Sequence, residues 1–63
     1  MISVKDNTTM TEVLINLDDV SNVRKQLQYN TNNIDYFNVT INFKSGAESI
    51  SLTLDETEAA KFL

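Results

Sequence analysis

The stretch that decides the fold is DYFNVTINFKSGAESISLTL, residues 35–54. Apolar and polar residues alternate on both sides of the chain's single glycine, Gly46, and this period of two is typical of half-buried strands. Glycine also tolerates the positive φ that a hairpin turn requires. The stretch therefore predicts two antiparallel strands joined near Ser45 and Gly46.

The register of this hairpin follows from its apolar positions. A two-residue turn or a four-residue loop around Gly46 aligns three apolar pairs: Ile41 with Ile50, Val39 with Leu52, and Phe37 with Leu54. A three-residue loop would turn the apolar residues of one strand to solvent, because successive side chains point to opposite faces. A Gly46–Ala47 turn would shift the pairing by two residues and would also match apolar with apolar. We therefore predict a register that pairs apolar with apolar, with these two alternatives.

Residues 55–63 predict a short helix after the second strand. Asp55 is a good N-cap, and Glu58, three residues later, gives the spacing of a capping box. Lys61 in the last turn complements the helix dipole. Ala59, Phe62 and Leu63 share the face that would pack on the sheet, and only such packing holds a helix of about two turns.

The N-terminal half has two interpretations. In the favoured one, residues 11–17 form a strand, and a helix runs from Asp18 or Asp19 to about Tyr29 or Asn30. Met1–Lys5 then adds an edge strand, with these pairs: Lys5 with Glu12, Val4 with Val13, and Ile2 with Ile15. In the rival interpretation, residues 10–29 form one helix with a broad apolar stripe. Its interior would hold weak helix formers such as Asn16 and Asp18.

These elements predict a single α+β domain over residues 1–63. The favoured order is β-β-α-β-β-α, a small antiparallel sheet with helices on one face. If residues 10–29 are one helix, the order becomes α-β-β-α.

The composition argues against most site chemistry. The chain has no Cys and no His, so disulfides, the commonest zinc ligands and the usual nucleophile–base pairs are all missing. A lone glycine in a hairpin also gives no phosphate-binding loop. We therefore expect no enzymatic activity, metal, cofactor or small-molecule substrate.

Charge and hydropathy bear on partners and location. The net charge is −4, and the five basic residues are scattered, so we expect no direct binding to DNA or RNA, which normally needs a basic face. No stretch reaches the ~20 apolar residues of a membrane span, and no signal-peptide pattern is present. The expectation is a cytoplasmic protein that does not enter a membrane.

The best candidates for a binding surface are two tyrosines and the polar side of the sheet. Tyr36 has the opposite parity to Phe37, so it should project from the open face of the sheet, and Tyr29 falls outside the apolar stripe of the predicted helix. Exposed tyrosines among polar amides are typical of interfaces. The predicted partner-binding residues are Tyr29, Tyr36, Asn38, Thr40 and Asn42, and the alternative is a solvated face without a partner.

The leading functional hypothesis is a small non-enzymatic protein-interaction module that regulates or inhibits a larger protein. The partner would be another protein or a second copy of this chain. An alternative from another class is an acidic nucleic-acid mimic, which needs one continuous carboxylate stripe formed by Asp18, Asp19, Asp35, Asp55, Glu56 and Glu58. The composition is typical of short reading frames in low-G+C bacteria and their phages, which makes a phage or mobile-element origin a further hypothesis.

Overall fold

The computed structural model describes residues 1–62, which form five strands and a short helical segment at the C-terminal end. Of these residues, 61% lie in strands. The strands are β1 (Ile2–Asp6), β2 (Thr11–Ile15), β3 (Val20–Thr31), β4 (Ile34–Phe43) and β5 (Ile50–Asp55). A 3₁₀ turn, η1 (Leu17–Asp19), precedes β3, and the helical segment consists of α1 (Glu56–Ala59) and the 3₁₀ turn η2 (Ala60–Phe62).

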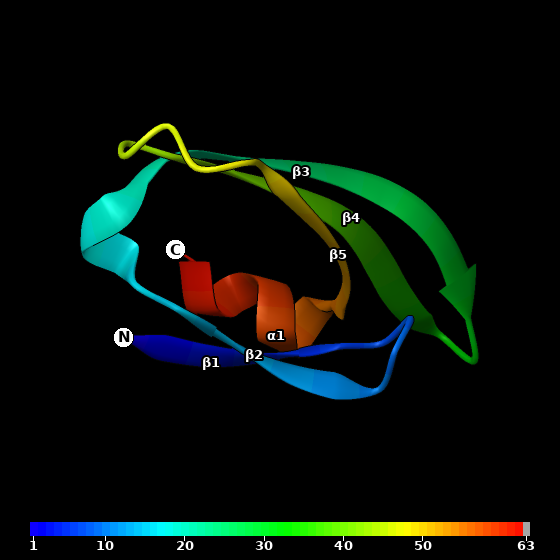
Figure 1. Ribbon diagram of the computed structural model, residues 1–63. Helices are drawn as coiled ribbons and strands as arrows, with labels where there is room; N and C mark the ends of the chain where they lie inside the picture. Colours follow the sequence, from blue (N-terminus) through cyan, green and yellow to red (C-terminus); the bar gives the residue numbers. More distant parts are fainter. Residues whose placement is uncertain (63) are drawn as a thin grey trace.

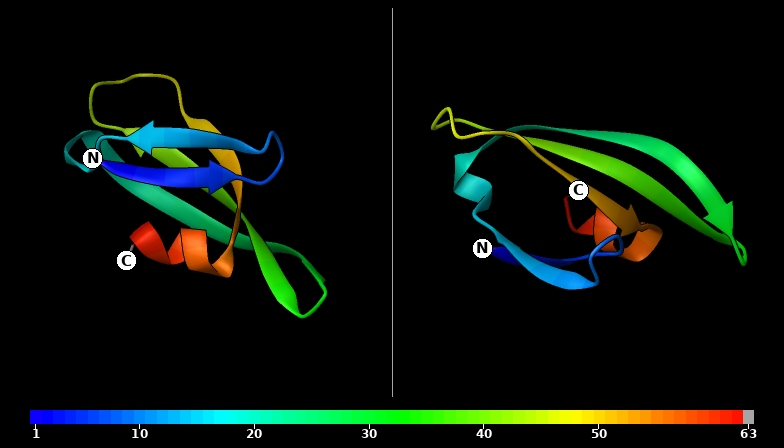
Figure 2. Two further views of the ribbon diagram at one scale, coloured as in Figure 1. Left: turned by 90° about the horizontal axis from the view of Figure 1, so that it is seen from below. Right: turned by 45° about the vertical axis from the view of Figure 1, so that its right-hand side comes forward.

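The strands form two antiparallel sheets that face each other across the core (Figure 1). One is the β1–β2 hairpin and the other has the order β3-β4-β5. The hairpin crosses one face of the larger sheet, and α1 lies beside β1, covering more of that same face (Figure 2). The core between them consists of Val4, Ile15, Val39, Ile41, Leu52, Leu54 and Ala59.

The predicted β1–β2 register is confirmed, and β4–β5 has the first of its two predicted registers, without the shift by two residues. In β4–β5, Ile41 pairs with Ile50, and the other two predicted apolar pairs are also present. In β1–β2, Lys5 pairs with Glu12, again with both other predicted pairs. The β4–β5 connection is longer than predicted, since residues 44–49 lie outside the strands, and Gly46 in this loop has a φ of 80°.

The predicted helix between Asp18 and Asn30 is wrong, and so is the single helix over residues 10–29. The α+β assignment with helices on one face therefore fails, because this segment is β3, the longest strand. Val23 and Leu27, four residues apart, share a face in a strand as well as in a helix, and Val20 joins that face three residues before Val23 because β3 has an irregularity between Val20 and Asn22. A bulge inserts an extra residue and shifts the parity, so the period of two is hidden.

A tight turn converts this half of the chain into a hairpin. Asn32 and Asn33 are the two residues between β3 and β4, and their φ values are 52° and 63°. Two successive positive φ values define the type I′ turn, whose twist matches that of the strands it joins. Asparagine tolerates this conformation better than most residues, so the Asn32–Asn33 pair is a hairpin signal. The prediction of a helix before it did not use this signal.

The C-terminal helical segment begins as predicted. The backbone N–H of Glu58 donates to Asp55 Oδ1 at 2.9 Å, so Asp55 is the N-cap. Ala59 is buried, and Phe62 packs partly buried against the core. Leu63, the third residue of the predicted apolar face, lies outside the described residues.

Candidate functional site

The two predicted tyrosines meet on the β3–β4 hairpin. Tyr29 and Tyr36 are paired across the strands, and their rings stack with centroids 4.9 Å apart and an interplanar angle of 19°. The extra residue near Gln28 gives Tyr29 the parity that places it on the same face as Tyr36. This contact was not predicted, because Tyr29 was expected at the end of a helix.

The stack lies near the turn end of the β3–β4 hairpin. Both views in Figure 2 show that this end of the hairpin extends beyond the rest of the molecule. We call residues 27–37 the arm. Three large side chains of the arm are well exposed: Leu27 (58%), Tyr29 (46%) and Ile34 (43%). Leu27 and Ile34 are interface candidates that were not predicted, and the Asn32–Asn33 pair just before the β-prone run of β4 is the signal that could have revealed the turn between them.

The other three predicted site residues, Asn38, Thr40 and Asn42, follow Tyr36 along the same face of β4. Their polar groups are largely used within the sheet. Asn42 donates to Asn22 Oδ1 at 2.7 Å and accepts from Ser49 Oγ at 2.6 Å, while Asn38 Oδ1 accepts from Ser51 Oγ at 3.1 Å. The structure thus places all five predicted residues on one face, with the amides tying the strands together and the tyrosines more available for contact.

The outer edge of the larger sheet is β3, which has no strand on its other side among residues 1–62. It carries the only two adjacent basic residues of the sequence, Arg24 and Lys25. The Lys25 Nζ lies 4.7 Å from the centroid of the Phe37 ring, a cation–π contact on the core side of the sheet. Arg24 is exposed, and by alternation it lies on the opposite face.

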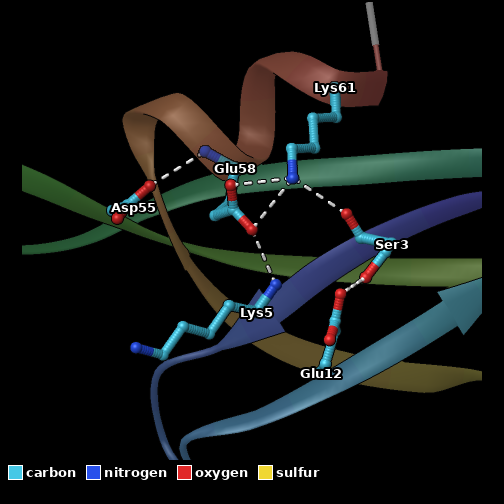
Figure 3. A network of polar contacts seen from close by, with 6 residues as sticks. All are labelled: Ser3, Lys5, Glu12, Asp55, Glu58 and Lys61. Carbon is cyan, nitrogen blue, oxygen red and sulfur yellow. Dashed lines mark hydrogen bonds and ion pairs between the residues drawn. The ribbon is translucent and has the colours of Figure 1, made fainter.

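The edge of β1 is covered by side chains of the helical segment (Figure 3). Glu58 Oε1 accepts from the backbone N–H of Lys5 at 2.8 Å, and Lys61 Nζ donates to the Ser3 carbonyl oxygen at 2.9 Å. Lys61 Nζ also pairs with Glu58 Oε2 at 3.0 Å, and Glu12 accepts from the Ser3 hydroxyl. These bonds satisfy backbone groups that an open edge strand would leave free.

The same contacts lower the pKa of Glu58. The largest cause is the hydrogen bond from the Lys5 backbone N–H, followed by the hydrogen bond from Lys61, and both favour the carboxylate. The spacing of Asp55 and Glu58 predicts a capping box, but the Glu58 side chain reaches β1 instead. Its charge therefore contributes to the docking of α1 on β1.

We expect Glu58→Gln to reduce the acid sensitivity of the protein. Because folding depresses the Glu58 pKa below its ordinary value of 4.5, the charge contributes fully above that value and is lost as the pH falls through the folded pKa. Urea unfolding between about pH 6 and about pH 3 should show a smaller loss of unfolding free energy for Glu58→Gln than for the parent. Glu48→Gln, an exposed loop carboxylate, is the control, and equal pH profiles for all three proteins would contradict the prediction.

The fold and this surface define a small β-rich protein with two facing sheets, a projecting hairpin arm and an open strand edge. No protein-family model matches the chain, and searches of curated proteins and of solved structures find no significant match. Among residues 1–62, no helix has the length and apolar character needed to cross a membrane.

Proposed function

We propose that this chain is a small non-enzymatic protein-interaction module that regulates or inhibits a larger protein, and that the arm is its main contact element. The observation that carries the proposal is the stacked tyrosine pair on a hairpin that projects from the core, flanked by exposed Leu27 and Ile34. Stacked rings lose little side-chain entropy on binding, and aromatic anchors supply much of the affinity at protein interfaces.

The proposed nucleic-acid mimic receives less support from the positions of the carboxylates. Asp18 and Asp19 belong to η1, and Asp35 lies near the hairpin turn at the opposite end of a molecule 37 Å long (Figure 1). Asp19 also accepts hydrogen bonds from the backbone N–H and hydroxyl of Ser45, and Asp55 caps α1. A continuous acidic stripe that includes all these groups is not formed, so we favour the interaction module.

The test is a capture experiment from native lysate with a matched pair of variants. Tyr29→Ala/Tyr36→Ala removes the stack, and we expect the captured protein to be lost or reduced at least about tenfold, the effect of a typical hot-spot pair. Leu14→Ala removes an exposed side chain from the outer face of β2 and should leave capture unchanged. A photo-cross-linking residue at position 34 should form a covalent adduct with the same protein.

The result that opposes the proposal is equally specific. If the double tyrosine variant retains its fold by circular dichroism and captures the same protein as the parent, the arm is not the contact element. Absence of any adduct from position 34 while capture persists would lead to the same conclusion.

A further inference from the structure

The backbone hydrogen bonds of β5 show which backbone N–H and C=O groups of β3, at the opposite edge of the sheet, have no partner strand. The N–H of Thr53 donates to Asp6 Oδ1 at 3.2 Å, and its carbonyl accepts from the N–H of Asn7 at 2.8 Å, so both groups of Thr53 point away from β4. Because alternate residues of an antiparallel strand point their backbone groups to opposite sides, the neighbours Leu52 and Leu54 must bond to β4.

The same alternation extends across β4 to β3. The β4 partners of Leu52 and Leu54 point toward β5, so Asn38 and Thr40 point toward β3, where they pair with Gln26 and Arg24. The remaining residues of that part of β3 therefore direct their N–H and C=O groups outward. These are Val23, Lys25 and Leu27.

This open ladder has a defined length. Between the irregularities after Val20 and after Leu27, the regular part of β3 is Asn22–Leu27. Six residues span ~20 Å at about 3.3 Å each, the length of an ordinary strand. An extended segment of another chain could therefore add along it with the hydrogen bonds of one more antiparallel or parallel strand.

The side chains of the edge determine what that segment must carry. Val23 and Lys25 line an apolar hollow of about 130 Å³ together with Val39, Ala59 and Phe62. Arg24 lies on the other face. In the part of the chain that the structure describes, the one ion pair joins Lys61 to Glu58. Neither Arg24 nor Lys25 therefore has a carboxylate partner there. Two unpaired cations beside an open ladder favour a strand with carboxylate side chains.

A second copy of this chain fits the edge poorly. Symmetric antiparallel pairing of β3 with itself sets Lys25 against Lys25 or Arg24 against Arg24, and like charges directly opposite each other are destabilising. Moving the centre to Gln26 sets Arg24 against the irregular position near Gln28, and moving it to Val23 sets Lys25 against the irregular position near Ser21, so the ladder is interrupted in both registers. The charge pattern thus selects a different chain.

We infer that the outer edge of β3, over Asn22–Leu27, binds an acidic extended segment of the partner protein as an added strand. This inference rests on the proposed function and names the chemistry of the partner. The segment alternates apolar residues, which face the side of Val23 and Leu27, with polar residues on the side of Arg24. One carboxylate lies among the polar residues near Arg24, and a second lies near Lys25, at the position of the other face that this cation shares with Val23 and Leu27.

The test is an mRNA-display selection in which random eight-residue peptides are enriched for binding to the full chain. We expect the enriched peptides to alternate apolar and polar residues and to contain two or more Asp or Glu. Amide shifts on peptide titration should be largest at Val23, Lys25 and Leu27. N-methylation of the peptide amides that face β3 should abolish binding, whereas N-methylation of the alternate amides should leave it unchanged, because only the first set makes ladder bonds.

Charge variants complete the test. Arg24→Glu/Lys25→Glu should weaken the binding of the acidic peptides about tenfold or more, since it replaces two attractions by repulsions. Because Lys25 contacts Phe37, Arg24→Glu alone is the variant to use if the double variant fails to fold, and about a threefold weakening is expected.

Several outcomes would overturn the inference. They are failure to enrich any peptide, enrichment without acidic residues, equal effects of the two N-methylated series, or dimerisation of the chain with concentration-dependent shifts along β3. None of these would remove the arm as a contact element, because the tyrosine variants in the capture experiment test that surface separately.

Discussion

Ile41→Ala is expected to remove about 2–5 kcal/mol of unfolding free energy. A domain of this length has a total of about 3–9 kcal/mol, from roughly 0.05–0.15 kcal/mol per residue, so much of the variant should be unfolded at room temperature. The Ile41 side chain is fully buried on the central strand β4, between Val23 on β3 and Ile50 on β5. Its truncation leaves a cavity that three strands would have to close.

Urea unfolding followed by circular dichroism measures this effect. Ile41→Val is the matched control and should cost only about 0.5–1.5 kcal/mol, because it removes a single methylene from the same position. Should Ile41→Ala cost no more than Ile41→Val, the packing around the middle of β4 would not hold the two sheets together as described.

Asp6→Ala is expected to cost about 3 kcal/mol, although it changes a polar residue. Asp6 is only 8% exposed, and its Oδ1 accepts from the backbone N–H groups of Thr8 at 3.0 Å and Thr53 at 3.2 Å. Thr53 is itself buried, so alanine at position 6 leaves its N–H without a partner. The same bond joins the β1–β2 hairpin to β5.

Thermal unfolding provides the measurement for Asp6. At about 4–8 °C per kcal/mol for a small domain, the melting temperature of Asp6→Ala should fall by roughly 12–24 °C. Asp6→Asn keeps an Oδ1 acceptor for Thr53, so its decrease should be less than half as large. Equal decreases for the two variants would mean that the carboxylate charge, and not its accepting oxygen, matters at this position.

Comparison of the two halves of the chain shows where sequence reasoning succeeded. In β4 and β5, the apolar residues lie on one face with a regular period of two, so matching them limited the register to pairings of apolar with apolar. The same reasoning worked for β1 and β2. In β3, only Val20 and Val23 are even partly buried, so too few apolar positions remained to reveal a strand.

The candidate site was predicted to a similar extent. The parity of β4 correctly placed Tyr36 on the face opposite Phe37, with Asn38, Thr40 and Asn42 along it. The position of Tyr29 depends on the irregularity after Leu27, and the open ladder at Val23 and Lys25 depends on the pairing of β3 with β4. Both belong to the tertiary structure.

By itself, the sequence determined the strands with a repeating apolar face, their register, and the cap at Asp55, because each depends on residues close together or on a pattern within one strand. Only the tertiary structure decided that residues 20–31 form a strand. The backbone hydrogen bonds of a strand are made to another strand, and β4 provides the partner groups for residues 20–31. The exposed side chains of this segment have little preference for a strand by themselves. The edge and the arm exist because of that pairing.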